Sequence, residues 1–395
     1  MALARAYRRN VAIAFACVAL LFLLNIQFGS LELSSTSLSA SAPKETIADT
    51  LSCSKLPLAN DTLVVMKTGS TELQDKLPIH FNTTLQCYPN YVIYSDVAEE
   101  FHGHQILDSL EDVDPEIKAN HDDFALYRRL QQESGRGALE QSELSGPGSK
   151  PPSASGKTEN PGWKLDKWKF LPMMSKTLQN HPERHWYIFV ETDTFLFWET
   201  LLAYLVVLDW TKPYYIGGQT WIGDVEFAHG GSGFLVSRPA LERVVKQYED
   251  NQRDWEKFTD NHWAGDCVLG TAFKDAGIPL TSAWPIFQGD DIGNMNYGHS
   301  QGLWCQPTVS YHHLDASAIT GLWNYAQSWA TRQPIVCHTT LSSRVELTIF
   351  ADAKAFSAAQ GCLCRIHTPS YSQNAIGVGQ PRQRRSRLSG FVREV

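Results

Sequence analysis

The sequence predicts an α/β fold with a mainly parallel central sheet. Three short apolar runs, at residues 62–66, 91–94 and 186–190, have the composition of buried strands and are separated by stretches with helical character. Strands that alternate with helices along a chain are typical of parallel sheets, whose ligands bind at the carboxyl ends of the strands. We therefore expect a binding site where these three runs end.

Turn and helix signals predict the remaining elements. In chain order they are a helix at 72–85 interrupted at Pro78, a flexible insertion rich in Gly, Ser and Pro at 134–161, a helix at 163–178 around Pro172, a strand at 234–238, an amphipathic helix opened by Pro239, a helix at 266–276 closed by Gly277, and a short strand ending at 311.

The N-terminus predicts a signal anchor of a type II membrane protein. Arg5, Arg8 and Arg9 form a basic tail (1–10), and an apolar segment (11–29) follows that is near the lower limit for a membrane span. A cleaved signal peptide is the alternative. We favour the anchor because the apolar segment is long and the small-residue site at 40–42 lies more than ten residues beyond it. Residues 30–58, rich in Ser, Thr and Ala, read as a stem.

Composition and short motifs indicate the cellular compartment of the protein and restrict its binding partners. A net charge of −8 argues against nucleic acid as a partner. Sequons at Asn60 and Asn82 predict N-glycosylation and agree with a lumenal domain. The eight cysteines give weak support for a lumenal location, where disulfides form. Because Cys17 lies in the anchor, an odd number of cysteines remains outside it, and the sequence does not determine their pairing. A basic cluster at 382–387 lies in a polar tail that we expect to be disordered.

The most informative stretch is WYIFVETDTFLFW, at residues 186–198. Strand side chains alternate, so Glu191 and Asp193 project to the same side where the strand leaves the core. Two carboxylates there are costly unless a positive charge lies between them. A hard divalent cation with phosphate oxygens in its shell fits this pattern, and two solvated acids are the alternative.

Three further patterns could carry chemistry. The glycine-rich loop FAHGGSGF at 227–234 contains His229, Gly230 and Gly231 and either approaches a ligand closely or forms a tight turn. Asp266, at a helix start, is either an N-cap or a general base held ionised by the helix dipole. His312 and His313 follow a short strand, where one could ligate a metal and the other pack.

A serine esterase is an alternative reading of other residues. The segment GHSQG around Ser300 matches a nucleophile elbow, and His229-Gly230-Gly231 resembles an oxyanion-hole loop. However, an elbow requires a buried strand before the serine and a helix after it. The flanking segments GDDIGNMNY and LWCQPTV provide neither, so this reading is disfavoured.

The ordered set VETDTFLFW, FAHGGSGFLVSR, GDCVLG and SYHHL resembles glycosyltransferase family 31. The similarity covers residues 63–323 and is greatest to the fungal Fringe-like branch, related to Fringe and core-1 β1,3-galactosyltransferases. It implies a Golgi type II membrane enzyme with a GT-A fold. Such an enzyme depends on a metal, usually Mn²⁺, and transfers galactose or N-acetylglucosamine from a UDP-sugar to a glycan acceptor with inversion, usually in β1,3 linkage.

The resemblance also implies site residues. Asp193 falls on the acid that binds Mn²⁺, and Glu191, where relatives often have Asp, reaches the metal only through water or contacts the nucleotide instead. Asp266 falls on the catalytic base, and His313, with His312 as the alternative, falls on a late histidine ligand. The donor and acceptor cleft would be formed by strand-end and loop residues: Lys67, Thr68, Asp96, Thr192, His229, Gly230 and Gly231.

These expectations define a catalytic domain at 59–345 and a C-terminal extension at 346–395 with a disordered tail from about residue 370. The resemblance fades beyond Trp323. Glu191 departs from the family pattern, in which Asp is common at this position, and Gly265 stands where many relatives have an acid. A catalytically silent member that binds glycans or nucleotides is therefore the second hypothesis. The donor sugar and the acceptor stay open.

Overall fold

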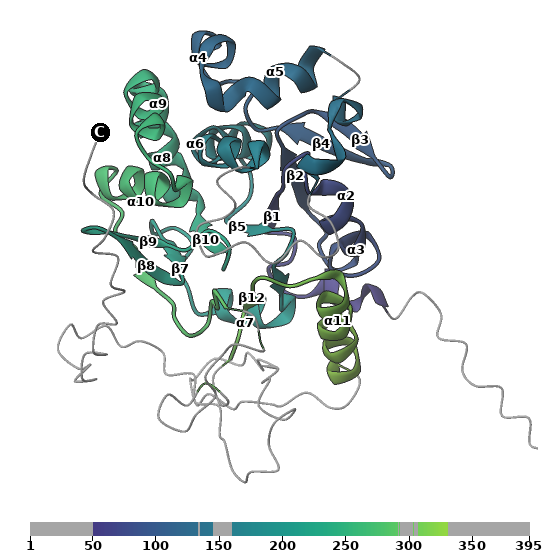
Figure 1. Ribbon diagram of the computed structural model, residues 1–395. Helices are drawn as coiled ribbons and strands as arrows, with labels where there is room; N and C mark the ends of the chain where they lie inside the picture. The colour runs from purple at the N-terminus through teal and green to yellow at the C-terminus, as the bar shows by residue number, and fades with distance from the viewer. Residues whose placement is uncertain are drawn as a thin grey trace, which may run out of the picture. The chain divides into compact units, whose positions relative to one another are not determined.

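The computed structural model describes residues 50–132, 135–144, 160–290, 292, 303 and 307–330 (Figure 1). The predicted anchor, Ser300 and the C-terminal extension lie outside these residues. No helix within the described part is long and apolar enough to span a bilayer.

The central sheet of the described residues has eight strands in the order β11-β7-β10-β5-β1-β2-β4-β3. Strand β1 lies at its centre and pairs in parallel with β2 and β5, as predicted. Strand β10 runs antiparallel to both of its neighbours, and β3 runs antiparallel to β4, so the sheet is mixed. The bounds are β1 Thr62–Lys67, β2 Tyr91–Ser95, β3 Glu99–Phe101, β4 His104–Asp108, β5 Trp186–Glu191, β7 Tyr215–Gly217, β10 Phe234–Ser237 and β11 Thr281–Ser282.

Helices cover both faces of the sheet, and two short strand pairs, β6 with β12 and β8 with β9, lie outside it (Figure 1). The α-helices are α2 Leu73–Lys76, α3 Pro78–Phe81, α4 Pro115–Asn120, α5 Ala125–Gln132, α6 Pro161–Asn180, α7 Trp198–Val206, α8 Arg238–Asp250, α9 Gln252–Asp260, α10 Gly265–Asp275 and α11 Ala316–Ala330. The outlying strands are β6 Phe195–Leu196, β8 Gln219–Ile222, β9 Val225–Ala228 and β12 Ser310–Tyr311.

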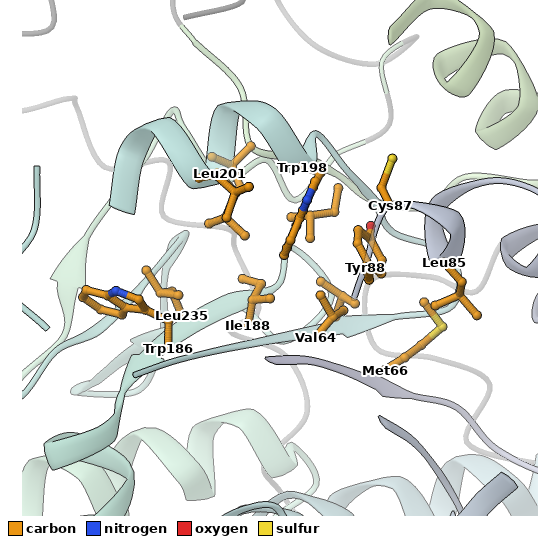
Figure 2. Packing of buried hydrophobic residues seen from close by; sticks show 14 of the residues in the cluster. Val64, Met66, Leu85, Cys87, Tyr88, Trp186, Ile188, Trp198, Leu201 and Leu235 are labelled. Carbon is orange, nitrogen blue, oxygen red and sulfur yellow. The ribbon is translucent and has the colours of Figure 1, made fainter. Parts of the chain in front are cut away.

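Alternation along the strands divides the core into two layers. Leu63 and Val65 of β1 face α6, α8 and α10, whereas Val64 and Met66 face α2 and α7. Figure 2 shows the second layer, in which Trp198 and Leu201 of α7 cover the strands. Because the strands are buried on both faces, they read as continuous apolar runs rather than as alternating ones.

The proline and glycine signals locate three predicted helices correctly. Pro78 begins α3, Pro239 lies in the first turn of α8, and Gly277 follows α10 with a positive φ of 76°. The N-cap assignment of Asp266 is wrong, because Ala264 is the N-cap of α10 and Asp266 is its second residue. The carboxylate of Asp266 is therefore available for other contacts.

The domain begins before residue 59, within the segment that the sequence assigns to the stem. Residues Thr50–Lys55 form a 3-10 helix, and the buried Cys53 is joined to Cys87 by a disulfide. The indole of Trp198 donates to the carbonyl of Cys53 at 3.1 Å. A cross-link over 34 residues typically adds about 2–4 kcal/mol to the free energy of unfolding, and this disulfide ties the chain entry to the end of the 3-10 helix Thr84–Gln86.

The described part of the predicted insertion contacts the domain. Two 3-10 helices, Gly135–Ala138 and Gln141–Glu143, precede α6. Arg136 pairs with Glu99 of β3 at 2.7 Å, and Arg129 of α5 pairs with Glu143. Residues 145–159 lie outside the described chain.

Candidate active site

Charged side chains meet where β1 and β5 end. Lys67 and Glu191 are register partners on these strands, and Lys67 Nζ lies 3.0 Å from Glu191 Oε1 and 2.5 Å from Asp166 Oδ1 of α6. Burial alone would raise the pKa of Glu191, but Lys67 outweighs it and holds this pKa well below its usual range. Glu191 is therefore a carboxylate, and the positive charge that compensates it is Lys67.

Asp193 faces a second lysine and a histidine. Its Oδ2 lies 3.0 Å from Nζ of Lys76 in α2, and its Oδ1 lies 3.2 Å from Nε2 of His312. The pairing of β6 with β12 brings these residues together, because β6 begins two residues after Asp193 and β12 ends one residue before His312. Asp193 is buried, yet Lys76 and His312 keep its pKa well below the usual value despite that burial.

Asp193, His312 and His313 form a potential metal-binding group. One ligand atom of each lies within 4.8 Å of the others. His313 has a positive φ of 58°, a conformation that non-glycine residues adopt rarely and that recurs at functional sites. Successive side chains of an extended strand point to opposite sides, so the left-handed backbone here allows two adjacent histidines to approach one position.

The donor atoms of this group fit a divalent cation. Asp193 Oδ1 and His312 Nε2 are buried and have no hydrogen-bond partner among the described residues, although they face each other. His312 Nδ1 lies 3.4 Å from the carbonyl of Gly289, to which it can donate, and this leaves a lone pair on Nε2. Burial opposes protonation, but Asp193 and Glu191 raise the pKa of His312 to about 10, so either a proton or a cation suits the space between these atoms.

Glu191, which the sequence places with the metal ligands, is not a member of the group. Its Oε2 lies 3.6 Å from His312 Nε2, while Oε1 is held by Lys67. Glu191 thus neighbours the potential metal position and contributes negative charge to it.

The glycine-rich loop after β9 positions two site residues. A Cβ on Gly231 would lie 2.1 Å from Cε1 of His312, so a side chain there would displace the imidazole. The N–H of Gly230 donates to Asp266 Oδ2 at 2.9 Å. The loop therefore positions the side chains of His312 and Asp266. This structural role accounts for the glycines of the segment that also resembles an oxyanion-hole loop.

His229, in the same loop, is a neutral imidazole. Its Nδ1 accepts from the N–H of Ser232 at 3.1 Å, and burial together with the nearby His312 lowers the pKa of His229 to about 4. The ring lines the cavity described below without adding charge to it.

Asp266 has the properties of a general base. Its Oδ1 accepts from the N–H of Cys267 at 2.9 Å and its Oδ2 from Gly230, so each oxygen keeps a free lone pair. Burial raises the pKa of Asp266 to about 6. Packing explains why the adjacent residue 265 is glycine, because a Cβ at Gly265 would lie 2.4 Å from Cδ2 of Phe170 in α6.

One cavity of about 1390 Å³ joins the metal-binding group to Asp266. Lys67, His229 and Gly231 line it, together with Lys76 and Asp166, which sequence reasoning missed. Gly230 does not line it and acts through its bond to Asp266. No pattern in the sequence pointed to Lys76, because its contact with Asp193 joins residues 117 positions apart.

Three residues that the sequence assigns to the cleft do not line this cavity. Thr68, Asp96 and Thr192 are buried and are not among the residues that line it. Asp96 accepts from the backbone N–H of Ser70 at 2.5 Å, and the hydroxyls of Thr68 and Thr192 lie 3.3 Å apart. These hydrogen bonds connect the segments that follow β1, β2 and β5, so the three residues have a structural role at the strand ends.

Both predicted glycosylation sites are accessible. Asn60 and Asn82 are exposed at the surface of the domain. Modification of either residue stays a prediction.

Comparison with protein families identifies the region that contains the site. Residues 171–328 match the family model described as Fringe-like. No curated protein matches the chain. The matched region runs from α6 into α11 and includes Asp193, Asp266, His312 and His313.

Proposed function

We propose that this chain, which carries a Fringe-like domain of glycosyltransferase family 31 at residues 171–328, is a glycosyltransferase that transfers a sugar from a UDP-sugar to a glycan acceptor with a divalent cation. The observation that carries the proposal is the position of the Asp193–His312–His313 group and Asp266 on one cavity. A metal-assisted transfer requires both a cation site and a base within reach of one substrate complex.

Each side chain has a distinct task in this proposal. Asp193, His312 and His313 hold the cation, and Lys76 neutralises the second oxygen of Asp193. When bound, a divalent cation such as Mn²⁺ neutralises charge that develops on the diphosphate leaving group. Glu191 and Lys67 form an ion pair beside this group.

Asp266 acts on the acceptor. Its carboxylate takes the proton of an acceptor hydroxyl while that oxygen forms a bond to the anomeric carbon of the donor. The bond from the same carbon to the diphosphate oxygen breaks, and UDP leaves. Attack and departure on opposite sides of the carbon invert its configuration, and a β1,3 linkage is the product that we propose. Galactose and N-acetylglucosamine are the donor sugars to be compared.

We also propose that the domain acts in the Golgi lumen, behind the predicted anchor. The Cys53–Cys87 disulfide supports an oxidising compartment, since such bonds are rare in cytosolic proteins. The accessible Asn60 and Asn82 sequons agree with it.

The direct test is UDP release by the purified full chain. We expect release from one UDP-sugar in the presence of Mn²⁺ and a glycan acceptor, and none in EDTA. Release that persists in EDTA would overturn the metal requirement. Binding of UDP and Mn²⁺ without release from any donor would favour the catalytically silent alternative.

The rate should depend on pH through Asp266. A general base works only when ionised, so kcat/KM should be constant above the pKa of about 6 and fall about tenfold per pH unit below it. The measurement is UDP release between pH 4.5 and 8, with the melting temperature followed over the same range to show that the protein stays folded. A rate that stays constant down to pH 4.5, as the pKa of an ordinary aspartate near 4 would give, would contradict the assignment.

A further inference from the structure

Exposed tryptophans are concentrated at the proposed active site. Trp221, Trp263 and Trp284 are 56%, 52% and 52% exposed, and all three line the cavity that contains Asp266. In the described part of the chain, the other exposed large hydrophobic residues are Val206 and Val207 at the end of α7. Large apolar surface left in water at one concave site indicates a ligand that covers it.

Packing explains why two of these indoles emerge together. Ile222 of β8 and Ala264 before α10 belong to one apolar cluster with Phe227 and Cys267. Trp221 precedes Ile222, and Trp263 precedes Ala264. Each tryptophan is thus adjacent in sequence to a residue anchored in the same cluster, while its own indole stays exposed to the cavity.

The position of Trp263 indicates which substrate these indoles bind. Trp263 lies three residues before Asp266, the proposed base, and both line the cavity. The base must contact the acceptor hydroxyl, so a ligand on Trp263 lies on the acceptor side of the reacting carbon. The metal-binding group, which would hold the diphosphate of the donor, is formed by other elements of the cavity lining.

The polar groups around the indoles suit a saccharide. Gln219 and Trp221 project to the same side of β8, because strand side chains alternate, and both line the cavity. Gln288 and Asp290 line it near Trp284 in the sequence. The face of an indole carries negative π density that attracts the C–H groups on one face of a pyranose ring, while amides and carboxylates bind its hydroxyls.

We propose that Trp221, Trp263 and Trp284 form the acceptor subsite and stack against the sugar rings of an oligosaccharide acceptor. This proposal rests on the proposed function, because it identifies the acceptor side through Asp266. It names the acceptor as carbohydrate over at least part of its contact with the enzyme, and it leaves donor binding to the metal-binding group.

Kinetics of single variants test the subsite. Replacing Trp221, Trp263 or Trp284 with Ala should raise the KM for an oligosaccharide acceptor about tenfold each, the effect of losing one stacking contact. Turnover at saturating acceptor and the melting-temperature shift with UDP and Mn²⁺ should stay unchanged. Phe at the same positions should restore most of the affinity. Val207→Ala removes an exposed apolar side chain away from the cavity and serves as the matched control.

Binding without turnover separates this proposal from the proposed function. In the Asp266→Asn variant, oligosaccharides containing β-linked galactose or N-acetylglucosamine should quench tryptophan fluorescence, and each Trp→Ala change should weaken that titration. If wild-type protein turns over no donor but the Trp-dependent quenching persists, the proposed function fails and the saccharide subsite stands. Unchanged acceptor KM in all three variants would overturn the subsite. So would Trp-dependent binding of an unglycosylated peptide or of lipid vesicles in place of oligosaccharides.

Discussion

Replacing Asp266 with Asn is expected to lower turnover by about 10²–10⁴-fold, the usual contribution of a general base. Asn is nearly isosteric with Asp, and its carbonyl oxygen can still accept one of the two N–H groups, from Gly230 or Cys267, that hold Asp266 now. The variant cannot take the acceptor proton. The metal-binding group is untouched, so the affinity for UDP and Mn²⁺ should stay near the wild-type value.

The measurement is UDP release with saturating donor and acceptor, alongside the melting-temperature shift caused by UDP and Mn²⁺. Asp275→Asn is the matched control, since Asp275 is the last residue of the same helix and is exposed to solvent. The control should retain its rate within about twofold, as surface substitutions usually have small effects. Full turnover by Asp266→Asn would place the base on another carboxylate of the cavity.

The regular elements could be predicted where a local pattern was long enough. Strands β1, β2, β5 and β10 are runs of four to six buried residues, and α6, α8 and α10 carry proline or glycine signals at their ends. Strands β6, β11 and β12 have two residues each, and only pairing with distant segments defines them. Helix α7 was missed because its sequence, WETLLAYLV, is apolar over most of its surface and shows little helical periodicity.

The candidate site was predictable at its acidic and histidine residues but not at their partners. Asp193, Asp266, His312 and His313 stood out because each follows or begins a predicted element. The lysines that compensate Glu191 and Asp193 could not be assigned, since their contacts depend on how separate segments fold together. For the same reason Thr68, Asp96 and Thr192 were assigned to the cleft, although they are buried and do not line the cavity.

The tryptophans illustrate the same limit. In the sequence Trp221, Trp263 and Trp284 are three of 12 tryptophans, and no pattern in their neighbouring residues places them at a shared surface. Only burial separates an indole that fills the core from one that faces the cavity. Exposure of an aromatic side chain is a property of the folded surface, and local composition does not encode it.

The second large effect is expected for Asp193→Asn, which should abolish the response of the protein to Mn²⁺. The substitution keeps the shape of the side chain and removes the charge that faces His312 Nε2 at 3.2 Å. For the wild type, a ligand at 100 times its Kd adds about 2.7 kcal/mol to the free energy of unfolding. At roughly 2–4 °C per kcal/mol, UDP with Mn²⁺ should raise the melting temperature by about 5–10 °C.

In Asp193→Asn this shift should disappear, and turnover should fall by at least about 100-fold, because cation stabilisation of the leaving group contributes several kcal/mol. Glu72→Gln is the matched control, since Glu72 and Asp193 share Lys76 as a partner, at 2.7 and 3.0 Å, but Glu72 lies outside the metal-binding group. Loss of the shift in both variants would show that Lys76 and its charge balance control the response. If the melting temperature of Asp193→Asn rose with UDP and Mn²⁺ as much as that of the wild type, the assignment of the cation to this position would be wrong. Asp193 is the carboxylate of the Asp193–His312–His313 group.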